Sequence, residues 1–251
     1  MTSLHASIAV VRVLVRREVL RFLRQPARIG AAIGTPLVLW FFLASGIGRQ
    51  FQPESLDISY GAFLFPAVLT LVAVFSAIFA AISIIEDRNE GWLQAVLAGP
   101  APFGAVAFGR VLGGAIVAWL QAAILLPMAC FTDLAPGFGA LLLTAGLLFL
   151  TCLGTSALGV YFAWRSPNSA AFHAVMNLVF MPMWLLSGAF FPAEAAQTWL
   201  SWCMRLNPLA WATDALRTAL ELHTLDLWST LGVVGAAAVM IVIASRRRVS
   251  M

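Results

Sequence analysis

Between two long apolar runs, the chain reads EDRNEGWLQAVLAGP over residues 86–100. Four of its first five residues are ionisable, and a charged side chain at the middle of a bilayer costs about 2.5–3.5 kcal/mol. The segment is therefore expected to leave the membrane. Asn89 is predicted to cap a short helix, Glu90 suits the positive end of that helix, and Gly99-Pro100 is a stop signal.

The short helix predicted within residues 86–100 has an apolar ridge. Its large apolar side chains are Trp92, Leu93, Val96 and Leu97, which share one face at helical spacing. An apolar ridge behind a charged entry suits docking into a groove of another protein. An ordinary polar loop between two spans is the alternative interpretation.

The composition is that of a polytopic membrane protein. Of 251 residues, 61% are hydrophobic and 10% are charged, and the mean hydropathy is +0.92, whereas soluble domains carry about 25% charged residues. All 15 basic residues are arginines, so the chain lacks the lysine of a nucleotide-binding P-loop. Any ATP must therefore be hydrolysed by another chain. The arginines lie where membrane topology favours them, which argues against a nucleic-acid partner.

Six apolar runs are long enough to cross a bilayer, which requires about 20 residues. The predicted spans are 29–48, 60–85, 103–131, 138–164, 170–191 and 227–244. With the N-terminus inside, twelve of the fifteen arginines fall on inner segments, which is a positive-inside bias. The expected fold is all-α, with both termini and residues 86–100 on the cytoplasmic side.

Residues 1–28 are predicted to form an amphipathic helix along the cytoplasmic face of the membrane. Its apolar stripe consists of Ile8, Val11, Val15, Val19 and Phe22. Its basic side, which is expected to lie near anionic lipid headgroups, carries Arg12, Arg16, Arg17, Arg21 and Arg24. A disordered basic tail is the alternative.

Residues 192–226 connect two predicted spans on the outer side but are rich in tryptophan and leucine. Two helical pieces, 193–205 and 209–222, are separated at Asn207-Pro208. Neither piece is long enough to cross the bilayer, and such segments pack on protein or line a cavity. The sequence therefore predicts a re-entrant helical hairpin before the last span.

Three motifs of this chain resemble those of ABC-2 type transporter permeases, the membrane subunits of ATP-binding-cassette exporters. They are LSGAFFP at 186–192, NPLAWATDALR at 207–217 and the Glu86…Glu90-Gly91…Leu97…Gly99-Pro100 loop. The chain departs from the family pattern at Trp92, where threonine is usual, and at Gln94, where glutamate is common. The resemblance implies two six-span subunits above two ATPase subunits, which bind the ATP and magnesium, with no cofactor in this chain. It also implies a bacterial or archaeal cytoplasmic membrane.

The resemblance also assigns roles to residues. Coupling to the ATPase is implied for Glu86, Asp87, Arg88, Glu90, Gly91, Trp92 and Leu93. Glu86 and Glu90 are expected to pair with basic residues of the ATPase or with Arg88, and Trp92 and Leu93 to fill its groove. An outer gate is implied for Gly188, Phe191, Pro192, Trp199, Asn207 and Pro208. His173 and Asn177 are candidates for a helix–helix hydrogen bond or for substrate contact.

No catalytic residue or metal ligand is predicted. An intramembrane protease would need a nucleophile or metal set, but the sequence has no G-x-S-x-G and no E-x-x-H motif. A non-transporting assembly or anchoring subunit of the same fold remains an alternative, as do a homodimer and a heterodimer. Cys130, Cys152 and Cys203 form no C-x-x-C pair and are interpreted as buried small residues, with a disulfide between Cys130 and Cys203 as the alternative.

Overall fold

A computed structural model describes residues 2–47, 58–99, 102–221 and 224–245. Every regular element in these ranges is a helix, which confirms the all-α prediction. The helices are α1 (Thr2–Leu23), α2 (Pro26–Ile47), α3 (Tyr60–Asn89), α4 (Trp92–Leu97), α5 (Phe103–Leu125), η1 (Leu126–Phe131), α6 (Phe138–Arg165), α7 (Ser169–Leu185), η2 (Ala193–Ala195), α8 (Thr198–Arg205), α9 (Pro208–Glu221) and α10 (Leu227–Ser245). Most of the predicted loop at 49–59, Pro100 and the basic residues 246–248 lie outside the described residues.

Five helices of the described ranges are long and apolar enough to cross a membrane, namely α2, α3, α5 with η1, α6 and α10. The predicted fifth span, 170–191, corresponds to the shorter α7, which ends at Leu185. The chain then turns, because the Ser187 hydroxyl bonds back to the Trp184 carbonyl at 2.6 Å and Gly188 adopts φ +76°. A left-handed residue cannot continue a helix and favours glycine. The span count of six stays a prediction.

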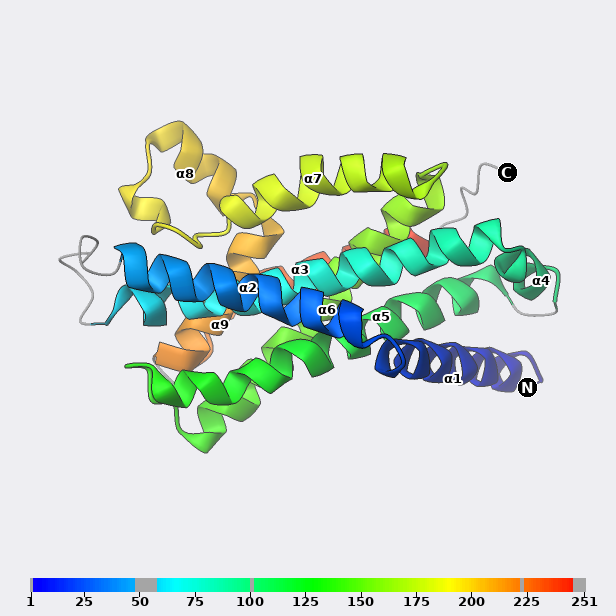
Figure 1. Cartoon of the computed structure of the whole chain (residues 1–251), viewed down its shortest axis with the longest axis horizontal. Coiled ribbons are helices and arrows are strands. Elements are labelled where there is room, and N and C mark those ends of the chain that lie inside the picture. Colours follow the sequence, from blue (N-terminus) through cyan, green and yellow to red (C-terminus); the bar gives the residue numbers. More distant parts are fainter. Residues whose placement is uncertain (1, 48–57, 100–101, 222–223, 246–251) are drawn as a thin grey trace.

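Helix α3 is the central helix of the bundle (Figure 1). It packs against α6, α5 and α2, and its side chains are buried along most of its length. Some polar side chains within the bundle find partners inside the protein: Ser76 Oγ donates to Gln121 Oε1 at 2.6 Å, and Thr70 Oγ1 donates to the Ala67 carbonyl. Such internal hydrogen bonds are needed because a hydrocarbon environment offers polar groups no other partners. Others, such as Ser156 Oγ and Trp164 Nε1, are buried without a hydrogen-bond partner among the described residues.

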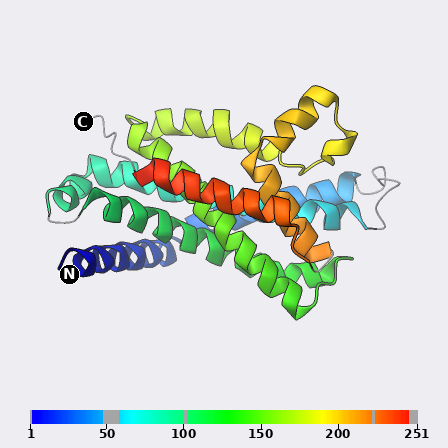
Figure 2. The same cartoon turned by 180° about the vertical axis from the view of Figure 1, so that it is seen from behind.

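The bundle has two ends, named here the α4 end and the α8 end. Helices α1 and α4 lie toward one end of the long axis, and α8 lies toward the other (Figure 1). Helix α10 runs across the back of the bundle toward the α4 end (Figure 2). The start of the described chain and the end of its last helix therefore lie toward the same end.

The segment between α7 and α10 is a helical hairpin. Its two helices, α8 and α9, are separated at Asn207-Pro208, as the sequence predicts. Asn207 stabilises the break, because its Oδ1 accepts from the Leu209 N–H at 3.0 Å and its amide donates to the Met183 carbonyl. Helix α9 is buried against α6, α10 and α3. Helix α8 lies outside and exposes Trp199 and Trp202.

The cysteine prediction is only partly correct. Cys152 is fully buried in α6, but Cys130 and Cys203 are exposed, and all three thiols are free. The prediction of buried positions is therefore wrong for the two exposed cysteines, which lie in the short helix after α5 and in the outer helix of the hairpin.

Candidate functional site

The charged stretch at 86–100 is divided between two helices. Helix α3 continues through Asn89, so the prediction that Asn89 caps the next helix is wrong. The break comes at Gly91, which has φ +79° and precedes α4. Gln94 Nε2 reaches back to the Arg88 carbonyl at 2.8 Å. Glycine is required at this position because a side chain with positive φ is strained.

Asp87 is the centre of a buried charge cluster at the α4 end. Its side chain is fully buried. Arg17 binds both of its oxygens at 2.7 Å, Arg21 donates to Oδ1 at 3.0 Å, and Arg110 donates to Oδ2. The charge of Asp87 thus remains inside the folded chain, where pairing offsets its desolvation.

Helices α1, α3 and α5 all contribute to this cluster. Arg110, which is 2% exposed, also donates to Glu18, and Arg21 binds Glu86 at 2.8 Å. We define the charge cluster as Arg17, Glu18, Arg21, Glu86, Asp87 and Arg110. Its three acids balance its three bases, which is what burial requires because an uncompensated charge in the interior is costly.

The position of α1 depends on two glycines of α5. A Cβ at Gly109 would lie 2.8 Å from Leu14 Cδ1, and a Cβ at Gly113 would lie 2.9 Å from Glu18 Cγ. The small residues let the two helices approach closely, as in other small-x-x-x-small contacts. This approach delivers Arg17, Glu18 and Arg21 to the end of α3.

Arg17 is held in its charged form by this arrangement. The hydrogen bonds from its guanidinium to Asp87 raise the pKa of Arg17 above the ordinary value, against the opposing effect of burial. Arg17 and Arg21 are only partly exposed and pair with Asp87 and Glu86, whereas the proximity of the basic side of α1 to lipid headgroups stays a prediction. Arg12, Arg16 and Arg24 are exposed.

Trp92 lies over the charge cluster. Its ring centroid is 3.7 Å from Arg17 Cζ and 5.0 Å from Arg110 Cζ. Leu93 is 1% exposed, and Val96 and Leu97 pack on the same core. The prediction that the apolar ridge fills a partner's groove is therefore wrong for Leu93, which packs into its own bundle. For Trp92, which is partly exposed, it stays a prediction.

The exposed face of α4 and of the turn before it is mostly small and polar. It consists of Glu90, Gly91, Gln94, Ala95 and Ala98. Arg88 does not pair with Glu86 or Glu90; its Nη2 donates to the Ser166 and Pro167 carbonyls and ties α3 to the turn between α6 and α7. Glu86 pairs with Arg21 instead, which leaves the carboxylate of Glu90 on the surface.

Glu18 and Arg110 are the members of the cluster that the sequence analysis does not select. Both carry a readable signal. Glu18 is the sole acidic residue in residues 1–28, and Arg110 is the sole charged residue between Glu90 and Asp133. A lone charge in an apolar stretch calls for a partner, although the sequence does not say which.

At the α8 end, the structure brings Gly188 to α9. Arg217 donates to the Gly188 carbonyl at 2.9 Å and to Asp214 at 3.1 Å, and its guanidinium lies 4.3 Å from the Phe63 ring. Phe191 and Pro192 are partly exposed in the following turn. Trp199, in contrast, is 65% exposed on α8 and bonds only to Gln197 among the described residues.

His173 and Asn177 lie one turn apart on the exposed face of α7. Within the described residues, no hydrogen bond joins either side chain to another helix, so the expected helix–helix hydrogen bond is not seen there. The neighbouring Leu178 is 77% exposed on the same helix. This face of α7 is therefore uncovered by the rest of the described chain.

We predict that replacing Trp92 with leucine lowers the free energy of unfolding by about 1 kcal/mol, because the cation–π contact with Arg17 is lost. Thermal unfolding of the purified chain measures the effect. The matched control is Trp228→Leu, since Trp228 is 85% exposed. Equal decreases in the unfolding midpoint of the two variants would contradict a role for the Trp92 ring in stabilising the charge cluster.

Comparison with known proteins adds an independent finding. Residues 9–220 match the family described as ABC-2 type transporter. The "Putative transport permease ycf38" of Cyanophora paradoxa is 25% identical over 210 residues, covering 82% of this chain and 72% of that protein. "Nodulation protein J" of Neorhizobium galegae is 27% identical over 202 residues, covering 79% and 76%. The "Probable multidrug ABC transporter permease YbhR" of Escherichia coli strain K12 is 27% identical over 187 residues, covering 73% and 50%. The family match includes the whole charge cluster and α4.

Proposed function

Because the chain belongs to the ABC-2 type transporter family, we propose that it is the membrane permease subunit of an exporter driven by a separate ATPase subunit. The absence of lysine supports the separate motor, since a P-loop needs that residue. In this proposal the α4 end faces the cytoplasm of a bacterial or archaeal cell, and ATP and magnesium bind to the ATPase. The substrate moves outward across the cytoplasmic membrane.

The family match over residues 9–220 carries this proposal, and the charge cluster beneath α4 supports its coupling step. The exposed face with Glu90, Gln94 and Ala95 contacts the ATPase, and Trp92 and Leu93 connect that face to the bundle. A push on α4 then moves α1, α3 and α5 together, because their charges are paired with one another. The motor biases the two states of the permease only by its differential affinity for them.

The substrate path in this proposal lies between two permease copies. The α7 face with His173 and Asn177 lines it, since polar groups at membrane depth are costly toward lipid. The hairpin forms the outer gate. The Arg217 contact to the Gly188 carbonyl holds the turn after α7 against α9 in the closed gate.

We expect Ala95→Trp to weaken association with the ATPase at least about tenfold, because the bulky ring occupies the exposed face of α4 while the core below it is unchanged. Co-purification of the two subunits from membranes measures this, and substrate-stimulated ATP hydrolysis measures coupling. Ala195→Trp, at an exposed position toward the α8 end, is the control for association. Undiminished co-purification of the Ala95→Trp variant would refute the docking face. Stable association without substrate-stimulated hydrolysis in the unmodified complex would favour an assembly subunit.

A further inference from the structure

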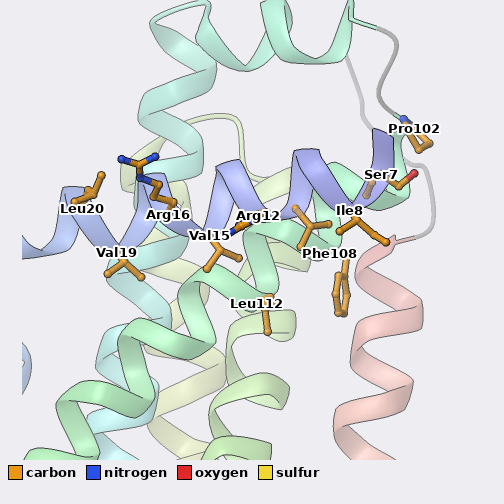
Figure 3. A pocket seen from close by; sticks show the side chains of 12 residues that line it. Ser7, Ile8, Arg12, Val15, Arg16, Val19, Leu20, Pro102, Phe108 and Leu112 are labelled. Atoms are coloured by element: carbon orange, nitrogen blue, oxygen red, sulfur yellow. The ribbon is translucent and has the colours of Figure 1, made fainter. Parts of the chain in front are cut away.

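Helix α1 covers an open apolar groove of about 1040 Å³. The groove lies between α1 and the first half of α5, and its walls include Val15 and Val19 from α1 and Phe108 and Leu112 from α5. In Figure 3 the two valines are on the edge of α1 that turns toward Leu112, whereas Arg16 is on the opposite edge. This volume slightly exceeds the range of about 300–1,000 Å³ that is usual for small-molecule sites.

A second hollow adjoins this groove and is basic. It has a volume of about 580 Å³ and is lined by Arg16, Arg17, Arg21 and Arg24 together with apolar and amide side chains. Arg16 and Leu20 line both hollows. The apolar groove thus continues over one edge of α1 into a group of arginines. This arrangement is complementary to an amphiphile that has an anionic head.

The arginines of α1 divide into two classes. Arg17 and Arg21 are neutralised by the carboxylates of Asp87 and Glu86. Arg12 and Arg16, which line the apolar groove, are exposed and make no ion pair within the described residues. No carboxylate among the described residues therefore neutralises their positive charges beside the groove. An anionic ligand would supply the missing negative charge.

We propose that this groove binds one anionic phospholipid, with the headgroup phosphate on Arg12 and Arg16 and the acyl chains along Val15, Val19, Phe108 and Leu112. Arginine suits a phosphate because its positive charge attracts the anion and its N–H groups donate hydrogen bonds to the phosphate oxygens. One apolar wall belongs to α5, which is among the helices long enough to cross the membrane. Hydrocarbon chains match these walls, whereas a polar protein surface does not.

The bound lipid fastens α1 to α5 from the side opposite the charge cluster. The same helix presents Val15 and Val19 to the groove and Arg17 and Glu18 to Asp87 and Arg110. Anionic lipid would therefore stabilise the docked position of α1. The inference needs only a membrane location, so it stands or fails separately from the proposed export activity.

The test uses the full chain in phosphatidylcholine nanodiscs that contain a trace of phosphatidylglycerol with a photoreactive diazirine in one acyl chain. We expect cross-links in peptides that contain residues 7–20 and 102–112, and competition by unlabelled phosphatidylglycerol but not by phosphatidylcholine. The double variant R12Q/R16Q should lower the cross-linking yield about tenfold, since each arginine near an anionic lipid contributes separately to the binding free energy.

Two controls make the result decisive. R12K/R16K keeps the charge and should retain most of the cross-linking, and R165Q removes an exposed arginine of α6 and should change nothing. Cross-links elsewhere, equal labelling by a phosphatidylcholine probe, or an equal loss in R12K/R16K and R12Q/R16Q would overturn the proposal. Loss of the cross-link when the partner ATPase binds would also overturn it and would assign the groove to protein docking.

Discussion

Replacing Arg110 with methionine is expected to lower the free energy of unfolding by about 3–5 kcal/mol, the usual cost of removing one partner from a buried ion pair. Arg110 is 2% exposed and bridges Glu18 of α1 and Asp87 of α3. Methionine fills much of the same space, so the loss is chiefly electrostatic. Asp87 keeps Arg17 and Arg21, but the cluster is left with one uncompensated negative charge.

Thermal unfolding of the purified chain measures this effect, and a decrease of roughly 10 °C in the midpoint is expected. Arg24→Met is the control, because Arg24 is exposed on α1 and makes no ion pair within the described residues. Surface substitutions of this kind usually change stability by about 0.5 kcal/mol or less. Equal decreases in the unfolding midpoint of the two variants would contradict the stabilising role of Arg110.

The double variant Arg110→Met with Glu18→Gln separates charge from packing. Glutamine keeps the shape of Glu18 but removes its charge, so the remaining Arg17, Arg21, Glu86 and Asp87 are balanced again. The double variant is expected to recover part of the stability lost by Arg110→Met alone, because the two positions are in contact and their effects are not additive. A double variant that is less stable than the single one would contradict the electrostatic account.

The five long helices could be predicted from the sequence because their signal is local. About 20 consecutive apolar residues suffice to span a bilayer, and this rule locates α2, α3, α5, α6 and α10. The break at Asn207-Pro208 is also local, since an asparagine side chain next to proline caps a new helix. Predictions of this kind depend on no distant contact.

The charge cluster could not be predicted because its contacts are distant in sequence. Glu86 and Asp87 read as the start of an exposed loop, but the side chains that neutralise them come from 65 and 70 residues earlier in the chain and from 23 residues later. The burial of Leu93 could not be predicted for the same reason. Helical spacing shows that Leu93 and Trp92 share a face, but not whether this face meets a partner or the chain's own core.

The end of α7 shows a third kind of limit. Residues 186–191 are apolar enough to extend the predicted span, yet the helix stops at Leu185. The stop depends on the left-handed Gly188, whose carbonyl is held by Arg217 from α9. A glycine is compatible with helix and with turn, and only the tertiary contact decides between them.

Replacing Gly109 with leucine is expected to displace α1 from the bundle. A Cβ at this position would lie 3.2 Å from Leu14 Cβ and 3.3 Å from the backbone Cα of Val11, so a longer side chain cannot fit by a rotamer change alone. Overpacking of this kind costs about 1–3 kcal/mol. Because α1 carries Arg17, Glu18 and Arg21, its displacement also opens the charge cluster.

Trypsin measures this displacement directly, because the chain has no lysine and trypsin can cut only after arginines. Cleavage after Arg17 and Arg21 reports α1 leaving Asp87, and we expect it to accelerate at least about tenfold in the Gly109→Leu variant. Gly104→Leu is the matched control in the same helix, since a Cβ there meets nothing within 4 Å. Equal cleavage rates in the two variants would contradict the close packing of α1 on α5.

A second substitution decides whether the effect is steric. Leucine has a higher helix propensity than glycine, by roughly 0.8–1 kcal/mol, so α5 itself should be strengthened by Gly109→Leu. Leu14 Cδ1 is the atom nearest to the added Cβ. Leu14→Ala in the Gly109→Leu background should therefore make room and slow the cleavage again, while Leu14→Ala alone should speed it by leaving a cavity. Rescue in the double variant would establish that the missing side chain at Gly109 is what allows α1 to bring its charges to Asp87.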